Sequence, residues 1–147
     1  MDIIATNRQA RFKYTLLEKY EAGLVLKGSE VKSLRNKNAS LNEAFAQVRG
    51  QEVYLYGLHI GPYQQAGLEA HEPRRPRKLL LNKAEMSRII GKVNERGYTL
   101  VPVTLYFNKR GIAKIEIALA KGKRLHDKRE AVRKREAARD IRRALKR

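Results

Sequence analysis

Residues 101–119 read VPVTLYFNKRGIAKIEIAL, and this stretch decides the fold that the sequence predicts. On either side of the turn segment 108–111, apolar residues occupy every second position: Val101, Val103, Leu105 and Phe107, then Ala113, Ile115, Ile117 and Leu119. A two-residue period is typical of a β-strand that buries one face and exposes the other. The stretch therefore predicts an antiparallel hairpin, with Pro102 near a strand start, where a missing donor costs least.

Further strands are predicted earlier in the chain. Residues 12–26, 44–48 and 53–60 are rich in Tyr, Leu and Val, which favour strands. The last two segments flank a short linker with Gly50, which is typical of a tight hairpin turn. The stretch 61–78 has little periodicity, so we expect a long loop that ends in a basic cluster.

One helix is well signalled over residues 83–96. Asn82 is a good N-cap, Glu85 completes a capping box, and Gly97 supplies the C-terminal stop. Leu81 and Met86 are spaced as a hydrophobic staple. A helix that begins with these signals should pack its apolar face on the strands.

A second, shorter helix is predicted over residues 29–35, with Ser29 as its cap and Val31 and Leu34 facing inward. Many short strands and two helices, without β-α-β alternation, indicate a mainly β protein with helices (α+β). We expect an antiparallel β-barrel or a strongly curled sheet.

The charge of the chain is one-sided. Of its 147 residues, 33 are Lys or Arg and 15 are Asp or Glu, a net charge of +18 that attracts polyanions. Residues 121–147 hold 13 basic and 4 acidic residues, and residues 1–120 hold 20 and 11. The tail thus carries +9 in 27 positions. We therefore predict a body, 1–120, and a basic tail, 121–147, that is disordered alone and winds into a helix on a polyanion.

Enzyme and metal signatures were sought in the sequence. Cysteine is absent, and no phosphate-cradling glycine loop or nucleophile elbow occurs. His59, His71 and His126 lie far apart, and none has a second ligand at metal spacing. We therefore predict no catalysis, no metal and no cofactor.

The chain also lacks a secretory segment at residues 1–8 and an apolar run of membrane-spanning length. We expect a cytoplasmic protein that does not enter membranes. Nucleic acid is the expected partner, because seven Tyr residues accompany the basic residues and an exposed ring can stack on an unpaired base. An anionic membrane surface is the rival partner, although the tail has no apolar face for it.

Three motifs together resemble the small protein B (SmpB) family. They are GSEVKSLR at 28–35, RKLLLN at 77–82, and GKRLHDKR at 122–129, in the family's order and spacing. The resemblance implies a β-barrel of the oligonucleotide-binding type with two to three packed helices. It also implies a monomer that binds the tRNA-like domain of transfer-messenger RNA (tmRNA). The pair would enter the A site of stalled ribosomes for trans-translation, which tags the nascent peptide.

The resemblance and the local charge also yield candidate site residues. Those for RNA binding in the body are Glu30, Lys32, Arg35, Arg77, Lys78, Leu80 and Asn82. Those in the tail, for the ribosomal decoding centre and mRNA channel, are Lys121, Lys123, Arg124, His126, Asp127, Lys128, Arg129, Arg133, Lys134 and Arg135.

Structural alternatives stay open for two of these residues. Glu30 could simply favour the first turn of its helix, where a carboxylate meets the positive end of the dipole. It could also serve RNA by holding an adjacent arginine in place. Asn82 could act only as a helix cap. The whole chain could also be a generic ribosomal RNA-binding protein.

Overall fold

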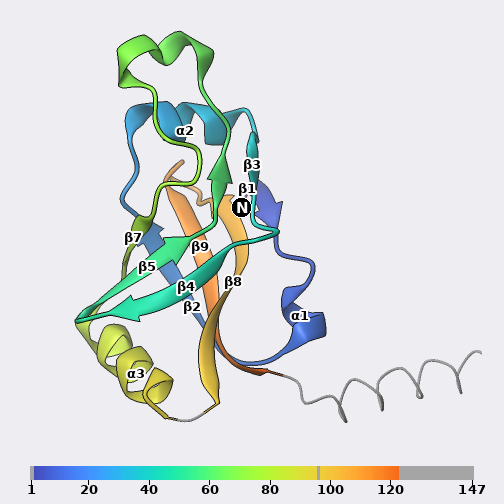
Figure 1. The fold of residues 1–147 in the computed structure, drawn as a ribbon, viewed down its shortest axis with the longest axis vertical. Helices are drawn as coiled ribbons and strands as arrows, with labels where there is room; N and C mark the ends of the chain where they lie inside the picture. Colours follow the sequence, from blue (N-terminus) through green and yellow to red (C-terminus); the bar gives the residue numbers. More distant parts are fainter. Residues whose placement is uncertain (1, 96, 123–147) are drawn as a thin grey trace, which may run out of the picture.

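The computed structural model describes residues 2–95 and 97–122 (Figure 1). The strands are β1 (Asp2–Thr6), β2 (Tyr14–Leu24), β3 (Ala39–Ser40), β4 (Phe45–Arg49), β5 (Glu52–Tyr56), β6 (His59–Ile60), β7 (Arg77–Leu80), β8 (Tyr98–Phe107) and β9 (Ala113–Gly122). The helices are α1 (Ala10–Lys13), α2 (Gly28–Arg35), α3 (Lys83–Val93) and the 3₁₀ segment η1 (Gln64–Glu69). The predicted class, mainly β with helices, is confirmed. No helix in these two ranges is long and apolar enough to cross a membrane.

Six antiparallel strands close into a ring. The pairings run β8–β4–β5–β7–β2–β9, and β9 pairs again with β8. Strand β1 pairs with residues 104–107 of β8, on the same edge that β4 meets at Leu100. The joints are unequal. Strand β9 is paired along most of its length with both β2 and β8, whereas a single residue pair, Ala46 with Leu100, joins β4 to β8. The long hairpin predicted from residues 101–119 is therefore one of the two most extensive joints of the ring, together with β2–β9.

The core lies inside this ring. Its fully buried members include Leu55, Leu105 and Ile117 from three strands. Helix α2 adds Leu34 and helix α3 adds Ile89, which are also fully buried, and Figure 1 shows these helices at opposite ends of the molecule. Burial of large aliphatic side chains contributes about 1.5–3 kcal/mol each, so the core holds both helices against the strands.

A bulge in β8 overturns the predicted alternation there. The register of β8 against β9 shifts between Pro102 and Thr104, so the face to which alternate side chains point switches at this position. Leu100 and Leu105 face the core, whereas Val101 packs outside it, against Ala10 of α1. The expectation that Val101 shares a face with Leu105 was therefore wrong. So was the expectation of a solvated second face, because most of β8 is buried on both sides.

Several predicted boundaries were also shifted. The strand expected from residue 12 begins at Tyr14, after α1, and the expected loop 61–78 contains η1 and the start of β7. Helix α3 ends at Val93, and Gly97 adopts a φ of 91° that favours glycine. Strand β9 continues to Gly122, two residues beyond the predicted boundary at residue 120.

The start of α2 differs from the prediction. Its N-cap is Lys27, and Ser29 lies inside the helix, where it is buried. The Ser29 hydroxyl lies 2.9 Å from Nδ1 of His71, whose Nε2 lies 3.0 Å from the Ile60 carbonyl oxygen. Ser29 thus ties α2 to the 61–76 loop, and the backbone of Lys27 begins the helix.

Candidate RNA-binding surface

The candidate RNA-binding residues of the body lie along one side of the molecule. Figure 1 shows α2 in the upper part of the molecule, below η1, with β7 below α2 and α3 at the bottom left. Glu30, Lys32 and Arg35 belong to α2, Arg77, Lys78 and Leu80 to β7, and Asn82 caps α3. The fold therefore brings the motifs at 28–35 and 77–82 together through β7, as two groups at the two ends of that strand.

Glu30 is the centre of the first group. Its carboxylate is fully buried and accepts a 2.8 Å hydrogen bond from the Lys27 backbone N–H. Arg75 donates to Oε1 through Nε, at 3.1 Å, and through Nη2. Arg77 donates to Oε2 through Nε at 2.6 Å. One buried carboxylate therefore fixes the start of α2 and two arginines that lie 45 and 47 positions away.

Arg77 is as buried as Glu30. Its remaining donors reach the Leu58 carbonyl oxygen at 2.6 Å and the Pro73 carbonyl oxygen at 3.1 Å. A direct phosphate contact, as predicted for Arg77, does not fit this placement, because its side chain has no exposed surface. The two-residue period could have indicated this: Arg77 and Leu79 point inward in β7, whereas Lys78 and Leu80 point outward or lie partly exposed.

The charges in this cluster offset one another. Burial alone would raise the pKa of Glu30, but the hydrogen bonds from Arg75, Lys27 and Arg77 outweigh it and hold that pKa below its usual value. Burial lowers the pKa of Arg77, and the Glu30 carboxylate opposes that change. The cluster is therefore an ionised carboxylate between guanidinium groups.

Arg75 is the member of the cluster that sequence reasoning missed. Its side chain keeps 24% of its surface exposed while it binds Glu30. Nη2 also donates to the Val25 carbonyl oxygen at 3.2 Å, and Nη1 donates to the Pro76 carbonyl oxygen at 3.4 Å. An arginine held this firmly at the surface presents its charge in a fixed place, which suits phosphate recognition.

The two predicted cations of α2 are exposed. Lys32 places its ammonium 5.4 Å from the centre of the Tyr63 ring, within cation–π range. Arg35 lies in the last turn of α2. Within the described ranges, neither residue forms an ion pair with a carboxylate. Lys32, Arg35 and Arg75 together form a cationic border on the α2 end of β7.

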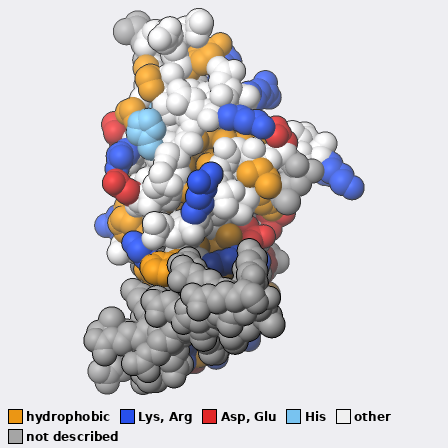
Figure 2. Space-filling view, turned by 90° about the vertical axis from the view of Figure 1, so that its right-hand side faces the viewer, with side chains coloured by type: hydrophobic (Ala, Val, Ile, Leu, Met, Phe, Trp, Pro, Cys, Tyr) orange, Lys and Arg blue, Asp and Glu red, His pale blue; other side chains and the backbone are white. Residues whose placement is uncertain are grey.

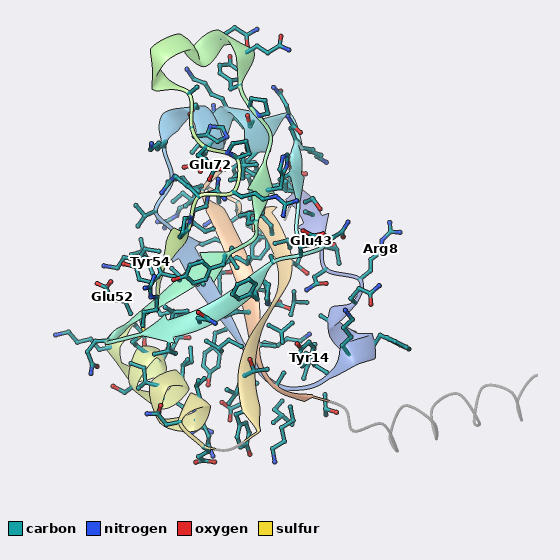
Figure 3. The ribbon with its side chains drawn as sticks, in the orientation of Figure 1. Arg8, Tyr14, Glu43, Glu52, Tyr54 and Glu72 are labelled. Atoms are coloured by element: carbon teal, nitrogen blue, oxygen red, sulfur yellow. The ribbon has the colours of Figure 1, made fainter. Side chains whose placement is uncertain are left out.

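The second group of candidate residues surrounds the other end of β7. Lys78 is paired with Glu52 at 2.7 Å, and Glu52 also accepts from the Tyr54 hydroxyl at 2.8 Å (Figure 3). Leu80 exposes 51% of its surface, a large fraction for an apolar residue. Asn82 caps α3 by accepting from the Glu85 N–H at 2.8 Å. The predicted cap is confirmed, and its role in RNA binding stays a prediction.

A shallow hollow of about 470 Å³ lies between β5, β7 and the first turns of α3. Leu80, Leu81 and Met86 give it apolar walls, and Lys78 and Lys83 lie on its rim. The mixture of apolar surface and ammonium groups suits the sugars, bases and phosphates of a nucleic acid.

One predicted tail residue lies within the described chain. Lys121 is part of β9, and its ammonium is 4.5 Å from the centre of the Tyr98 ring, which Lys92 approaches to 5.6 Å. The other predicted tail residues lie outside the described residues: Lys123, Arg124, His126, Asp127, Lys128, Arg129, Arg133, Lys134 and Arg135. The position of Lys121 makes it part of the body.

Some other titratable groups of the described body form surface ion pairs. Arg88 donates to Glu18 through Nε at 2.8 Å and, together with Tyr20, lowers the Glu18 pKa to about 2. On the face that Figure 2 shows, Lys and Arg are scattered among acidic and apolar side chains and do not gather in one patch. In the described ranges, no group of His, Asp and Glu is arranged to hold a metal ion.

A closed antiparallel ring with a net charge of +18 and cations at both ends of β7 defines a small basic β-protein with a surface suited to nucleic acid. The comparisons identify its family. The model described as "SmpB protein" matches residues 4–147, so the chain belongs to the SmpB family.

Curated relatives match this chain in sequence over nearly their whole length. An SsrA-binding protein of Carboxydothermus hydrogenoformans is 54% identical and covers 98% of this chain and 96% of its own length. One of Moorella thermoacetica is 51% identical, with 98% and 93% covered.

A solved structure supports the relationship. It is described as "tmRNA-SmpB: a journey to the center of the bacterial ribosome", and it is 50% identical with a TM-score of 0.68. The match covers 87% of this chain and 93% of that one. The fold and the family therefore agree.

Proposed function

We propose that this protein binds tmRNA and works with it on the ribosome in trans-translation, delivering it to the A site of stalled ribosomes. The observation that carries the proposal is the family match over residues 4–147, together with relatives named as SsrA-binding proteins and a relative described with tmRNA and the ribosome. We propose that this work takes place in the cytoplasm, which a ribosome-bound relative supports.

The body is proposed to bind the tRNA-like part of tmRNA with the surface along β7. Arg75, Lys32 and Arg35 supply charge at one end, and Leu80 and Asn82 supply apolar and polar contacts at the other. Glu30 acts as a positioning residue, because its carboxylate is buried and touches RNA only through Arg75. The free N–H groups at the start of α3 add donors for phosphate.

The mechanism is positioning, and no covalent step is assigned to the protein. Each phosphate neutralised releases counterions, so log affinity should fall by about 0.7–0.9 per log unit of salt for every contact. Shape is expected to give the specificity, because double-stranded RNA hides its base edges in a deep groove. The basic segment after Gly122 is proposed to engage the decoding centre and the mRNA channel, since 12 of its 25 residues are Lys or Arg.

Truncation after Gly122 tests whether the body binds tmRNA and the segment after Gly122 engages the ribosome. The truncated protein should bind tmRNA within about tenfold of the full chain in filter binding, because the β7 surface is intact. Peptide tagging on stalled ribosomes in vitro should collapse. A truncated protein that tags normally contradicts the assignment of the tail.

A second comparison tests the partner itself. The full chain should prefer tmRNA over an arbitrary RNA of equal length at physiological salt. Equal affinity for both would favour the alternative of a generic ribosomal RNA-binding protein.

A further inference from the structure

The outer face of the β4–β5 hairpin carries exposed aromatic rings that the β7 surface does not include. Phe45, Gln47 and Arg49 of β4 point outward, and Tyr54 and Tyr56 of β5 are half-buried opposite them. The alternate residues of both strands, such as Ala46 and Leu55, are buried in the core. The rings therefore lie on a rigid sheet whose inner side is fixed by packing.

The rings are ordered among themselves. Phe45 is paired across the strands with Tyr56, and their ring centres lie 5.3 Å apart with planes only 18° apart. Tyr54 lies 6.4 Å from Tyr56. Phe45 nevertheless exposes 47% of its surface, so one face of the stacked pair remains open to a further flat group.

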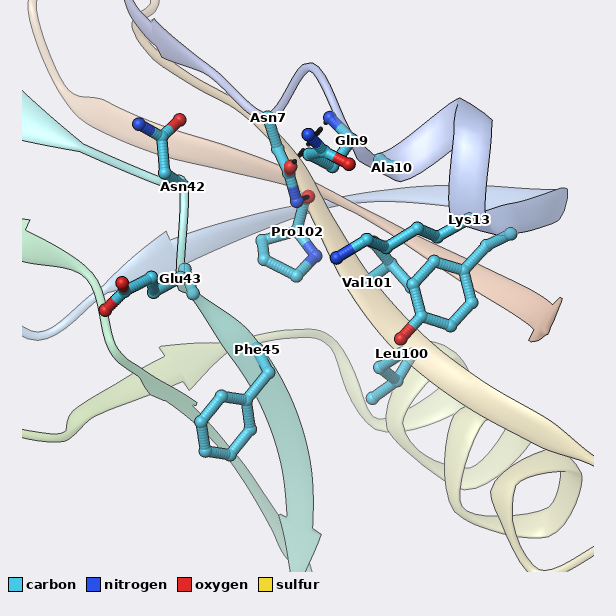
Figure 4. A pocket seen from close by; sticks show the side chains of 12 residues that line it. Asn7, Gln9, Ala10, Lys13, Asn42, Glu43, Phe45, Leu100, Val101 and Pro102 are labelled. Carbon is cyan, nitrogen blue, oxygen red and sulfur yellow. Dashed lines mark hydrogen bonds between the residues drawn. The ribbon is translucent and has the colours of Figure 1, made fainter.

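Positive charge accompanies the rings. Arg49 donates to the Tyr56 hydroxyl at 2.7 Å and places its guanidinium 6.0 Å from the centre of that ring. At the other end, Phe45 also lines a hollow of about 190 Å³ between β4, β8 and α1 (Figure 4). Lys13 directs its ammonium toward this hollow, and the amide of Asn42 lies on its rim.

From this arrangement we propose that the outer face of the β4–β5 hairpin is a stacking site for unpaired RNA bases. Phe45 would stack on a base, and Lys13 and Arg49 would contact the flanking phosphates. Every base has a flat π face, so stacking on aromatic side chains tolerates any sequence and gains from nearby arginine. The net charge of +18 favours RNA over an apolar protein partner. The proposal rests on the proposed function only in taking RNA as the partner.

The absence of tryptophan from the chain allows a direct test. In the full chain, Phe45→Trp places a single fluorophore on the stacking site. Ile112→Trp is the matched control, because Ile112 is 50% exposed and lies in the turn between β8 and β9. A short unstructured oligoadenylate should quench Phe45→Trp and leave Ile112→Trp nearly unchanged, and duplex RNA of the same length should quench both weakly. Equal quenching of both variants, or none in Phe45→Trp, overturns the proposal.

An affinity measurement complements the fluorescence. Phe45→Ala, with an unchanged melting temperature, should weaken oligoadenylate binding about 5- to 150-fold, the loss of one stacked base. Phe45→Tyr keeps an aromatic ring at this position and should bind within about threefold of the unmodified protein. Unchanged binding by Phe45→Ala contradicts the stacking site.

The same preparations separate this proposal from the broader one. If tmRNA is preferred over arbitrary RNA but Phe45→Trp is not quenched by oligoadenylate, the stacking site fails and the proposed function stands. If oligoadenylate quenches Phe45→Trp but tmRNA is not preferred, the stacking site stands and the proposed function fails.

Discussion

The two ends of β7 place their side chains in opposite ways. At the first end, Arg77 is drawn into the protein with Glu30, and both are fully buried. At the other end, the apolar Leu80 exposes half of its surface beside the cap residue Asn82. The comparison shows that residue type alone does not tell which side chains of a motif are buried in the fold and which are exposed to a partner. The charged Glu30 and Arg77 are buried in the fold, and the apolar Leu80 is exposed.

The largest effect is expected at the buried end. Glu30→Ala leaves the Arg77 guanidinium buried without its carboxylate, which costs about 3–5 kcal/mol of the free energy of unfolding. Urea denaturation followed by circular dichroism measures this loss. Glu43→Ala is the control, because Glu43 pairs with Arg74 at the exposed surface and its removal should change stability little. A Glu30→Ala protein as stable as the control would mean that the cluster does not support the fold.

The pH dependence of stability is a second test of the buried Glu30 cluster. Because the pKa of Glu30 is lower in the folded protein than in the unfolded chain, the ionised carboxylate stabilises the protein above its ordinary pKa of 4.5. This advantage over Glu30→Gln is full near pH 7 and is lost as the pH falls through the folded pKa. Urea midpoints of the two proteins should converge on acidification. A constant difference would contradict the linkage.

A smaller effect is expected at Asn82. Asn82→Ala removes the acceptor for the Glu85 N–H and should cost about 0.5–2 kcal/mol. Asn82→Ser keeps an oxygen in the cap and should recover most of that loss. Thermal melting gives the stability, and filter binding with tmRNA shows whether Asn82 has a second role. If Asn82→Ser restores stability but not affinity, the amide contacts the RNA. If it restores both, Asn82 is only a cap.

The smallest change in stability is expected at Leu80. Leu80→Ser should change the free energy of unfolding by less than about 0.5 kcal/mol, because the side chain is half exposed. Affinity for tmRNA should fall about fivefold, since half of a leucine surface is lost from the interface. The two measurements on one protein separate stability from binding. An unchanged affinity would exclude Leu80 from the RNA surface.

Much of this fold could be predicted from local signals. The hairpin of 101–119, the turn at Gly50 and the cap of α3 follow from residue period and turn chemistry, which act within a few positions. The phase change at Val103 could not, because a bulge depends on the pairing of β8 with β9. The period predicted from one strand alone therefore placed Val101 on the wrong face.

The candidate site shows the same limit. The motifs at 28–35 and 77–82 lie together along β7, as their shared resemblance suggested. The partners of Glu30 could not be predicted locally, because they lie 45 and 47 positions away. A cluster of four basic residues at 74–78 does not reveal which of them the fold will bury. The alternation with Leu79 indicates that Arg77 points inward in β7. Arg75 precedes the strand, so the same alternation does not indicate its partial exposure.

The joint between β4 and β8 has one further consequence. With only Ala46 and Leu100 paired there, separation of these strands breaks fewer backbone hydrogen bonds than separation at any other joint of the described ring. Local unfolding occurs first where the fewest contacts are lost, so we expect the ring to open first between β4 and β8. The β4–β5 hairpin lies next to that joint. A break at this joint leaves the long pairings of β9 with β2 and β8 in place.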